Sequence, residues 1–204
     1  MDNTILIINF GTKHLNKITD ILTCIDRHIL IKIVEWDEFN LDNFVQGSII
    51  GIILSGSPYH LYESGCPTIN PLILKQKIPV LGICYGMQFI ANMYGGIVHK
   101  MDKEEFGIYQ VDLLHNSKIF DNLTSPLTVC MQHYDQVLDI PNDIKILGHT
   151  KSCIAAIENV DESTHTFIYG VQFHPEIDNT GSGKIILSNF MKICKQCLDS
   201  KHKL

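Results

Sequence analysis

Apolar runs that would be buried on both faces are the feature that most constrains the fold of this 204-residue chain. The run "IPVLGIC" at 78–84 contains no charged or amide side chain, and the runs at 4–10 and 49–55 are nearly as apolar. Strands of this kind are typical of parallel sheets covered by helices on both sides. Together with a further strand at 30–36, they predict an α/β fold with a mostly parallel central sheet and flanking helices.

Helices and additional strands account for the remaining sequence. Apolar residues at helical spacing predict helices near 15–29, 69–76 and 85–95 and at the C-terminus. In the second half, closely spaced apolar segments with little helix between them predict strands that complete the same domain. No linker, repeat or low-complexity tract interrupts the sequence, so we expect a single domain over 1–204.

Composition excludes several classes of function. Hydrophobic residues make up 45% and charged residues 19% of the chain, which is typical of a well-packed globular protein. The formal net charge is −6 and there is no long basic run, which argues against nucleic acid as a partner. No apolar run approaches 18 residues and the N-terminus lacks signal-peptide features, so we expect no membrane span and a cytoplasmic location. The seven scattered cysteines are then expected to be reduced thiols.

One cysteine lies where a nucleophile is expected. The segment Gly82-Ile83-Cys84-Tyr85-Gly86 has the spacing of a strand–turn–helix elbow, in which two glycines permit a cramped turn. The N-terminus of the following helix would favour the thiolate, and the backbone N–H of Tyr85 would point to where an attacked carbonyl develops negative charge. The alternative is that Cys84 is a packed, unreactive thiol, as most buried cysteines are.

A second cysteine pair, Cys194 and Cys197, has the spacing of half a metal site. No other such pair exists, and the spacing also fits one face of the last helix. We therefore expect no metal on this chain.

A cysteine nucleophile needs a histidine base, and the segment "GVQFHPE" provides the best candidate. Pro175 forces His174 into an extended conformation, and residues two apart on an extended chain project to the same side. Glu176 can therefore hold the His174 ring and stabilise the imidazolium. The alternative is an incidental surface pair after a strand; it is disfavoured because Cys84 also follows a strand, where parallel sheets place their sites.

The two motifs "GICYGMQ" and "GVQFHPE" together resemble the class I (triad) glutamine amidotransferase family, and the similarity runs through nearly the whole chain. The resemblance implies a flavodoxin-like fold in which Cys84 attacks the side-chain amide of glutamine to give a γ-glutamyl thioester and ammonia. It further implies that His174 serves as acid and base, and that Glu176 supports it.

Segments between these motifs are similar to the glutaminase part of GMP synthases. They are "ILSGSP", "KEEFG" and "CMQHYDQV". By that resemblance, the turn amides at Gly56 and Ser57 join Tyr85 in an oxyanion hole. The substrate-binding residues that the resemblance implies are Gln88, Gln132, Tyr134 and Asp135, with Asp135 pairing with the α-ammonium of glutamine and backbone groups near Gln132 and Tyr134 holding its α-carboxylate.

Two residues depart from the pattern of the family. Ser57 and Tyr134 stand where the family usually has glycine. If the turn at Ser57 requires a positive φ, serine there costs on the order of 1 kcal/mol and leaves the oxyanion hole poorly formed. Tyr134 is expected to narrow or reshape the mouth of the pocket.

The resemblance also implies a partner. Nothing in this sequence resembles a nucleotide-activating domain, so the ammonia is expected to pass to a separate ATP-dependent synthetase subunit that adenylates xanthosine monophosphate and makes GMP. No cofactor is expected on this chain. Two alternatives remain at this stage: a stand-alone hydrolase of the same fold that acts on another γ-glutamyl amide, and a non-catalytic regulatory module that retains the fold.

Overall fold

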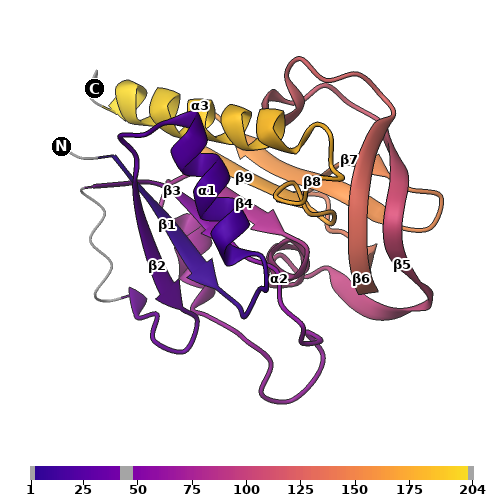
Figure 1. Ribbon diagram of the computed structural model, residues 1–204. Helices are drawn as coiled ribbons and strands as arrows, with labels where there is room; N and C mark the ends of the chain where they lie inside the picture. Colours follow the sequence, from indigo (N-terminus) through magenta and orange to yellow (C-terminus); the bar gives the residue numbers. More distant parts are fainter. Residues whose placement is uncertain (1–2, 42–47, 202–204) are drawn as a thin grey trace.

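The computed structural model describes residues 3–41 and 48–201 (Figure 1). Within these residues the strands are β1 (Thr4–Asn9), β2 (Leu30–Glu35), β3 (Ile49–Leu54), β4 (Val80–Ile83), β5 (Ile97–Leu113), β6 (Leu127–Asp139), β7 (Lys145–His149), β8 (Ile154–Asp161) and β9 (Thr166–Val171). The helices are α1 (Leu15–Ile25), α2 (Tyr85–Met93) and α3 (Gly183–Lys201), with short 3₁₀ helices η3 (Pro71–Lys75) and η4 (Lys118–Phe120).

The described strands form one mixed sheet in the order β2-β1-β3-β4-β9-β8-β7-β5-β6. Strands β2, β1, β3, β4 and β9 run parallel, and the neighbours from β9 to β6 run antiparallel. The predicted α/β class is therefore confirmed, and the runs apolar on both faces, β1, β3 and β4, lie in the parallel part. The closely spaced segments of the second half form the antiparallel part, except that the last of them, β9, pairs parallel with β4.

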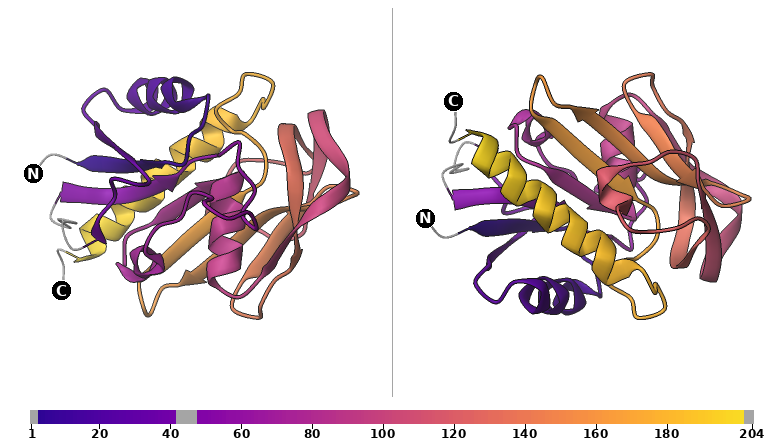
Figure 2. Two further views of the ribbon diagram at one scale, coloured as in Figure 1. Left: turned by 90° about the horizontal axis from the view of Figure 1, so that it is seen from below. Right: turned by 90° about the horizontal axis from the view of Figure 1, so that it is seen from above.

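Helices cover both faces of the parallel strands, and alternate residues of each strand point to opposite layers. On one face, Ile5 and Ile7 pack in a cluster with residues of α1 and α3. On the other face, Leu6 and Ile8 pack in a second cluster with residues of α2. Views from opposite sides show α3 across one face and α2 across the other (Figure 2).

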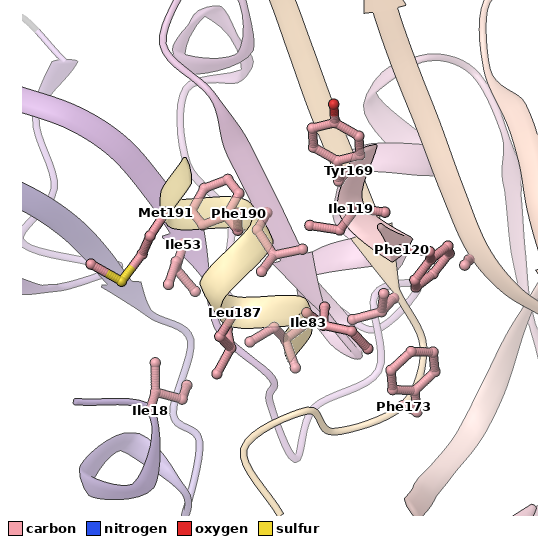
Figure 3. Close-up of a cluster of buried hydrophobic side chains, with 14 of the residues drawn as sticks. Ile18, Ile53, Ile83, Ile119, Phe120, Tyr169, Phe173, Leu187, Phe190 and Met191 are labelled. Atoms are coloured by element: carbon pink, nitrogen blue, oxygen red, sulfur yellow. The ribbon is translucent and has the colours of Figure 1, made fainter. Parts of the chain in front are cut away.

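The larger cluster anchors the C-terminal helix to the sheet. Leu187 and Phe190 of α3 are fully buried and lie over Ile53 and Ile83 of the two central strands (Figure 3). Fully burying each side chain of this size contributes about 1.5–3 kcal/mol. This packing fixes the position of β4, the strand that leads into Cys84.

Two segments differ from expectation in length. Strand β5 continues through 101–106, and β6 continues through the segment "MQHYDQVLD", which has no long apolar run. Their pairing contains a register shift between Lys100 and Glu105, which indicates a bulge. Each strand of this hairpin has one exposed face, which carries polar residues. These segments therefore lack the apolar run expected of a buried strand, although backbone pairing makes them strands.

Three helices also differ in extent. Helix α1 ends at Ile25, and Ile29 is buried beyond it; α2 ends at Met93, and the predicted helix near 69–76 is the 3₁₀ helix η3. Among the described helices, we find none long and apolar enough to span a membrane.

Candidate active site

Cys84 lies at a sharp turn between β4 and α2. Its φ of 53° and ψ of −106° are unusual for a residue with a side chain, and it is the N-cap residue of α2. Its N–H donates to the carbonyl of Val171 at 2.8 Å, and its carbonyl accepts from the N–H of Gln88 at 3.1 Å. Two fixed backbone hydrogen bonds therefore hold a strained backbone, a combination that is common at functional sites.

Gly82 and Gly86 permit this turn because a side chain at either position would meet backbone atoms. A Cβ atom at Gly82 would lie 2.5 Å from the carbonyl carbon and oxygen of Gly86, and one at Gly86 would overlap the carbonyl of Leu54. Backbone atoms cannot rotate away as a flexible side chain can. The Gly-x-Cys-x-Gly spacing is therefore a requirement for the close approach of α2 to β3 and β4.

His174 follows β9, the strand that pairs with β4. Ile83 and Val171 are register partners, so the carboxyl ends of the two strands lie side by side. The backbone of His174 is fixed on both sides: its N–H donates to the Cys130 carbonyl at 3.0 Å, and its carbonyl accepts from the Thr180 hydroxyl at 2.7 Å. The ring thus reaches the Cys84 side chain across neighbouring strands.

Glu176 fixes the tautomer of His174. Nδ1 of the ring lies 2.7 Å from Oε1 of Glu176. Because a carboxylate accepts, Nδ1–H is the donor, and Nε2 is the nitrogen available to the sulfur of Cys84. The other carboxylate oxygen of Glu176 is buried and has no hydrogen-bond partner among the described residues.

The charges of this group are strongly coupled. The side chains of His174 and Glu176 are 6% and 1% exposed. Burial opposes the charged ring, but the neighbouring Cys84 sulfur and the Glu176 carboxylate outweigh it and raise the pKa of His174 well above its ordinary value. The arrangement therefore favours an imidazolium between sulfur and carboxylate, which can give a proton to a leaving group.

The turn after β3 lies beside both reactive side chains. A Cβ atom at Gly56 would lie 3.3 Å from Cε1 of His174 and 3.7 Å from Cβ of Cys84. Ser57 does not have a positive φ, and its hydroxyl accepts from the N–H of Tyr59 at 3.2 Å. The left-handed backbone considered for Ser57 is therefore wrong, and serine carries no such conformational penalty here.

The third predicted oxyanion donor, the backbone N–H of Tyr85, is at the first residue of α2. The first N–H groups of a helix have no partner within the helix, which leaves them available to a ligand. The side chain of Tyr85 is engaged elsewhere, because it is buried and its hydroxyl donates to the carbonyl of Pro67 at 2.6 Å.

A cavity of about 330 Å³ opens in front of Cys84 and His174. Most of the predicted site residues line it; they are Ser57, Cys84, Tyr85, Gln88, Gln132, Tyr134, Asp135 and His174. The other two lie outside the cavity lining: Glu176 bonds to the ring of His174, and Gly56 lies beside that ring. The sequence thus predicted residues that the structure brings together.

The predicted substrate-binding residues already have protein partners. Gln88 is buried, and its Nε2 donates to the carbonyl of Asp135 and to Oε1 of Gln172, both at 3.1 Å. Tyr134 is half exposed at the cavity mouth, where its ring packs against Phe106 with centroids 4.9 Å apart. The contacts of these residues with glutamine remain predictions.

A second Cys/His/Glu group lies beside the cavity and is distinct from Cys84, His174 and Glu176. Glu105, His133 and Cys153 are buried with their polar atoms within 4.8 Å of one another. Burial favours the neutral acid, but hydrogen bonds from His133, Thr150 and Cys153 outweigh it and lower the pKa of Glu105. Since Nδ1–H of His133 donates to the carbonyl of Asp135 at 2.8 Å, this network supports the strand that carries Asp135.

Sequence reasoning missed three residues of the site. Gln172 donates to the Cys84 sulfur at 3.5 Å, and its position two residues before His174 on an extended chain was an available signal. His60 and Tyr62 bind the Asp135 carboxylate from the loop after Ser57, and no local pattern connects that loop with β6.

Comparison with protein families gives one match that covers most of the chain. The family model described as "Glutamine amidotransferase class-I" matches residues 6–194. Among curated proteins, the "GMP synthase [glutamine-hydrolyzing]" of Borrelia garinii is 46% identical over 150 residues, which are 72% of this chain and 28% of that protein. The Fusobacterium nucleatum protein of the same name is 36% identical over 188 residues, 92% of this chain and 35% of that protein. The chain therefore spans about a third of the length of the curated relatives it matches.

Solved structures with the same fold include one from Thermoplasma acidophilum and one from Thermotoga maritima. A protein of Thermoplasma acidophilum described as a subunit of GMP synthase has a TM-score of 0.82 and 26% identity, with 99% of this chain and 98% of that one covered. A glutamine amidotransferase of Thermotoga maritima has a TM-score of 0.74 and 18% identity, with 96% and 97% covered. Both structures align with this chain over nearly its full length, and the second, at 18% identity, shows the fold alone.

Proposed function

The chain belongs to the class I glutamine amidotransferase family, and we propose that it hydrolyses the side-chain amide of glutamine to glutamate and ammonia. The observation that supports this most directly is the ring of His174 held between the Cys84 sulfur and the Glu176 carboxylate at one end of the cavity. A thiolate, a charged imidazole and an orienting carboxylate are the parts that acyl transfer from an amide requires.

In the first half of the reaction, the sulfur of Cys84 attacks the amide carbon of glutamine. The carbonyl oxygen gains negative charge, which backbone N–H groups at Tyr85 and at the Gly56–Ser57 turn would stabilise. His174 then gives its proton to the departing nitrogen, the C–N bond breaks, and ammonia leaves a γ-glutamyl thioester on Cys84. Glu176 stabilises the imidazolium before the proton is transferred.

In the second half, water attacks the thioester while Nε2 of His174 takes a proton from it. The C–S bond breaks, glutamate leaves, and the sulfur and the charged ring return to their starting state. The proton given to the departing ammonia and the proton taken from water both pass through Nε2, which the 2.7 Å bond between Nδ1 and Glu176 keeps directed at the sulfur. The remaining proton of water leaves the new γ-carboxyl group to solvent. The steps use side chains and backbone groups of this chain.

Glutamate release by the purified chain tests the proposal, with Cys84→Ala as the variant. We expect release to fall to background while thermal unfolding is unchanged, because the sulfur is the atom that forms the thioester. Cys24→Ala is the matched control, since Cys24 is exposed on α1 and lies outside the cavity lining. Undiminished release by Cys84→Ala would refute the mechanism.

We further propose that the ammonia is passed to a separate ATP-dependent synthetase that makes GMP from xanthosine monophosphate. Support comes from the curated relatives, which are named GMP synthase and are about three to four times as long as the matched region, and from the Thermoplasma protein described as a subunit of GMP synthase, 98% of which aligns with this chain. The test combines this chain, amide-labelled glutamine, ATP and xanthosine monophosphate with a candidate synthetase. Label in GMP supports the proposal; glutamate release that is confined to other γ-glutamyl amides would support a stand-alone hydrolase instead.

A further inference from the structure

The carboxylate of Asp135 is held by two side chains of the loop that follows β3. Nδ1 of His60 lies 2.7 Å from one carboxylate oxygen, and the hydroxyl of Tyr62 donates to the other at 3.1 Å. The Asp135 side chain is only 5% exposed, whereas that of His60 is 27% exposed. A buried acid is therefore paired with a histidine that solvent can reach.

The His60 ring is fixed in this position by its neighbours. It stacks on the ring of Tyr62 with centroids 5.4 Å apart and planes at 22°, and it meets the ring of Tyr134 edge-on at 6.1 Å. Because a carboxylate accepts, Nδ1 of His60 carries the hydrogen, and Nε2 is the nitrogen that exchanges a proton. His60 and Asp135 both line the cavity that contains Cys84.

We infer that His60 is a positioning residue for the α-ammonium of glutamine, and that a proton on its Nε2 sets the affinity for the substrate. The inference rests on the proposed function, in which Asp135 receives that ammonium. Each carboxylate oxygen can accept two hydrogen bonds, so Asp135 retains room for an ammonium beside its present donors. When His60 is neutral, the pair carries one negative charge and attracts the ammonium; when His60 is protonated, the pair is neutral and the imidazolium repels it.

An imidazole changes charge between pH 5 and 8, within the range where enzymes are assayed. When an effector, here the proton on His60, changes the affinity for a second ligand, the change is typically about 5–150-fold, so we expect roughly a tenfold loss of glutamine affinity when His60 is charged. Other titratable groups face the same space, and their effects on binding must be distinguished from that of His60. They are Lys13, His14, Tyr59, Cys84, Tyr85, His133, Tyr134 and His174 on the cavity wall, and Tyr62 stacked on His60.

Glutamine binding to the Cys84→Ala variant, measured by calorimetry at pH 6 and pH 8, separates affinity from turnover. We expect the Kd at pH 6 to be about tenfold higher than at pH 8. His60→Asn on the same background should bind almost equally at both pH values, because its amide nitrogen replaces Nδ1 as a donor to Asp135 but does not titrate. His14→Asn is the matched control: His14 lines the same cavity and contacts Gln132, so this variant should keep the pH dependence.

Two further readouts do not depend on the His60 variant. Glutamine binding between pH 6 and pH 8 should release protons, measured in buffers of different ionisation enthalpy. 5-Amino-5-oxopentanoate, which lacks the α-ammonium, should show no tenfold loss at pH 6. Equal glutamine affinity at both pH values would overturn this inference and leave the proposed function standing. So would a ratio of the Kd values at pH 6 and pH 8 that is the same in His60→Asn as without this substitution. Absence of glutamine binding at either pH overturns it together with the proposed function.

Discussion

Replacement of Gly82 by alanine should damage both stability and activity, and the structure gives the size of the conflict. The added Cβ would lie 2.5 Å from the carbonyl carbon and oxygen of Gly86 and 2.6 Å from the nitrogen of Met87. Ordinary contact begins at 3.4 Å, so β4 and the start of α2 must separate by about 0.9 Å. The atoms that the new Cβ would meet all belong to the backbone, so no side chain can rotate away to relieve the overlap.

Overpacking of this kind costs about 1–3 kcal/mol. For a chain of this size, each kcal/mol lowers the unfolding temperature by about 2–4 °C, so we expect a decrease of roughly 2–12 °C. A displacement near 1 Å at the reacting atoms reduces turnover by about a hundredfold. We therefore expect glutamate release to fall further than the loss of folded protein at the assay temperature explains.

The assay pairs circular dichroism melting with glutamate release, and Gly181→Ala is the control. A Cβ at Gly181 meets nothing within 4 Å, and Gly181 lacks a positive φ, so its replacement should change neither quantity. If Gly82→Ala unfolds within one or two degrees of the parent and turns over normally, close packing of α2 on β4 is not what positions Cys84.

Two further substitutions test the charges around the site. Glu176→Gln removes the charge that helps to raise the pKa of His174, so the basic limb of the pH–rate profile should move to lower pH. The variant also loses a charged hydrogen bond of about 1.5–3 kcal/mol, which predicts a 10- to 150-fold lower rate of glutamate release. If the basic limb stays at the same pH, Glu176 does not act on the ring of His174. Glu105→Gln breaks a buried pair with His133 and should cost about 3–5 kcal/mol at pH 7 by urea unfolding. Because the Glu105 pKa is lowered in the folded state, the stability difference should shrink as pH falls below 4.5, its ordinary value; a constant difference would contradict this.

The parallel strands of the first half, β1 to β4, and the position of Cys84 were predictable because their signals are local, whereas the parallel pairing of β9 with β4 was not. A strand such as β4 must be apolar on both faces, and the glycines around Cys84 follow from backbone contacts one turn away. His174 and Glu176 were predictable for the same reason, since Pro175 fixes their relative orientation within three residues.

Features that depend on distant backbone were not predictable. The length of β5 and β6 results from pairing between strands whose exposed faces are polar. The bulge near Glu105 is not indicated by any residue pattern in the sequence. The φ angle of Ser57 depends on the type of turn, and the presence of serine where the family usually has glycine does not determine that type. His60 and Tyr62 gain their role only because the fold places their loop against β6.

The pairing of β4 with β9 has a consequence for the order of events during synthesis. The sulfur emerges from the ribosome 90 positions before the imidazole that activates it, and every strand from β5 to β8 is translated in the interval. A chain synthesised only as far as β8 therefore carries Cys84 without the histidine that faces it in the complete fold. The proposed nucleophile and base meet only when β9 pairs with β4, so the proposed reaction requires the sheet to be complete as far as β9.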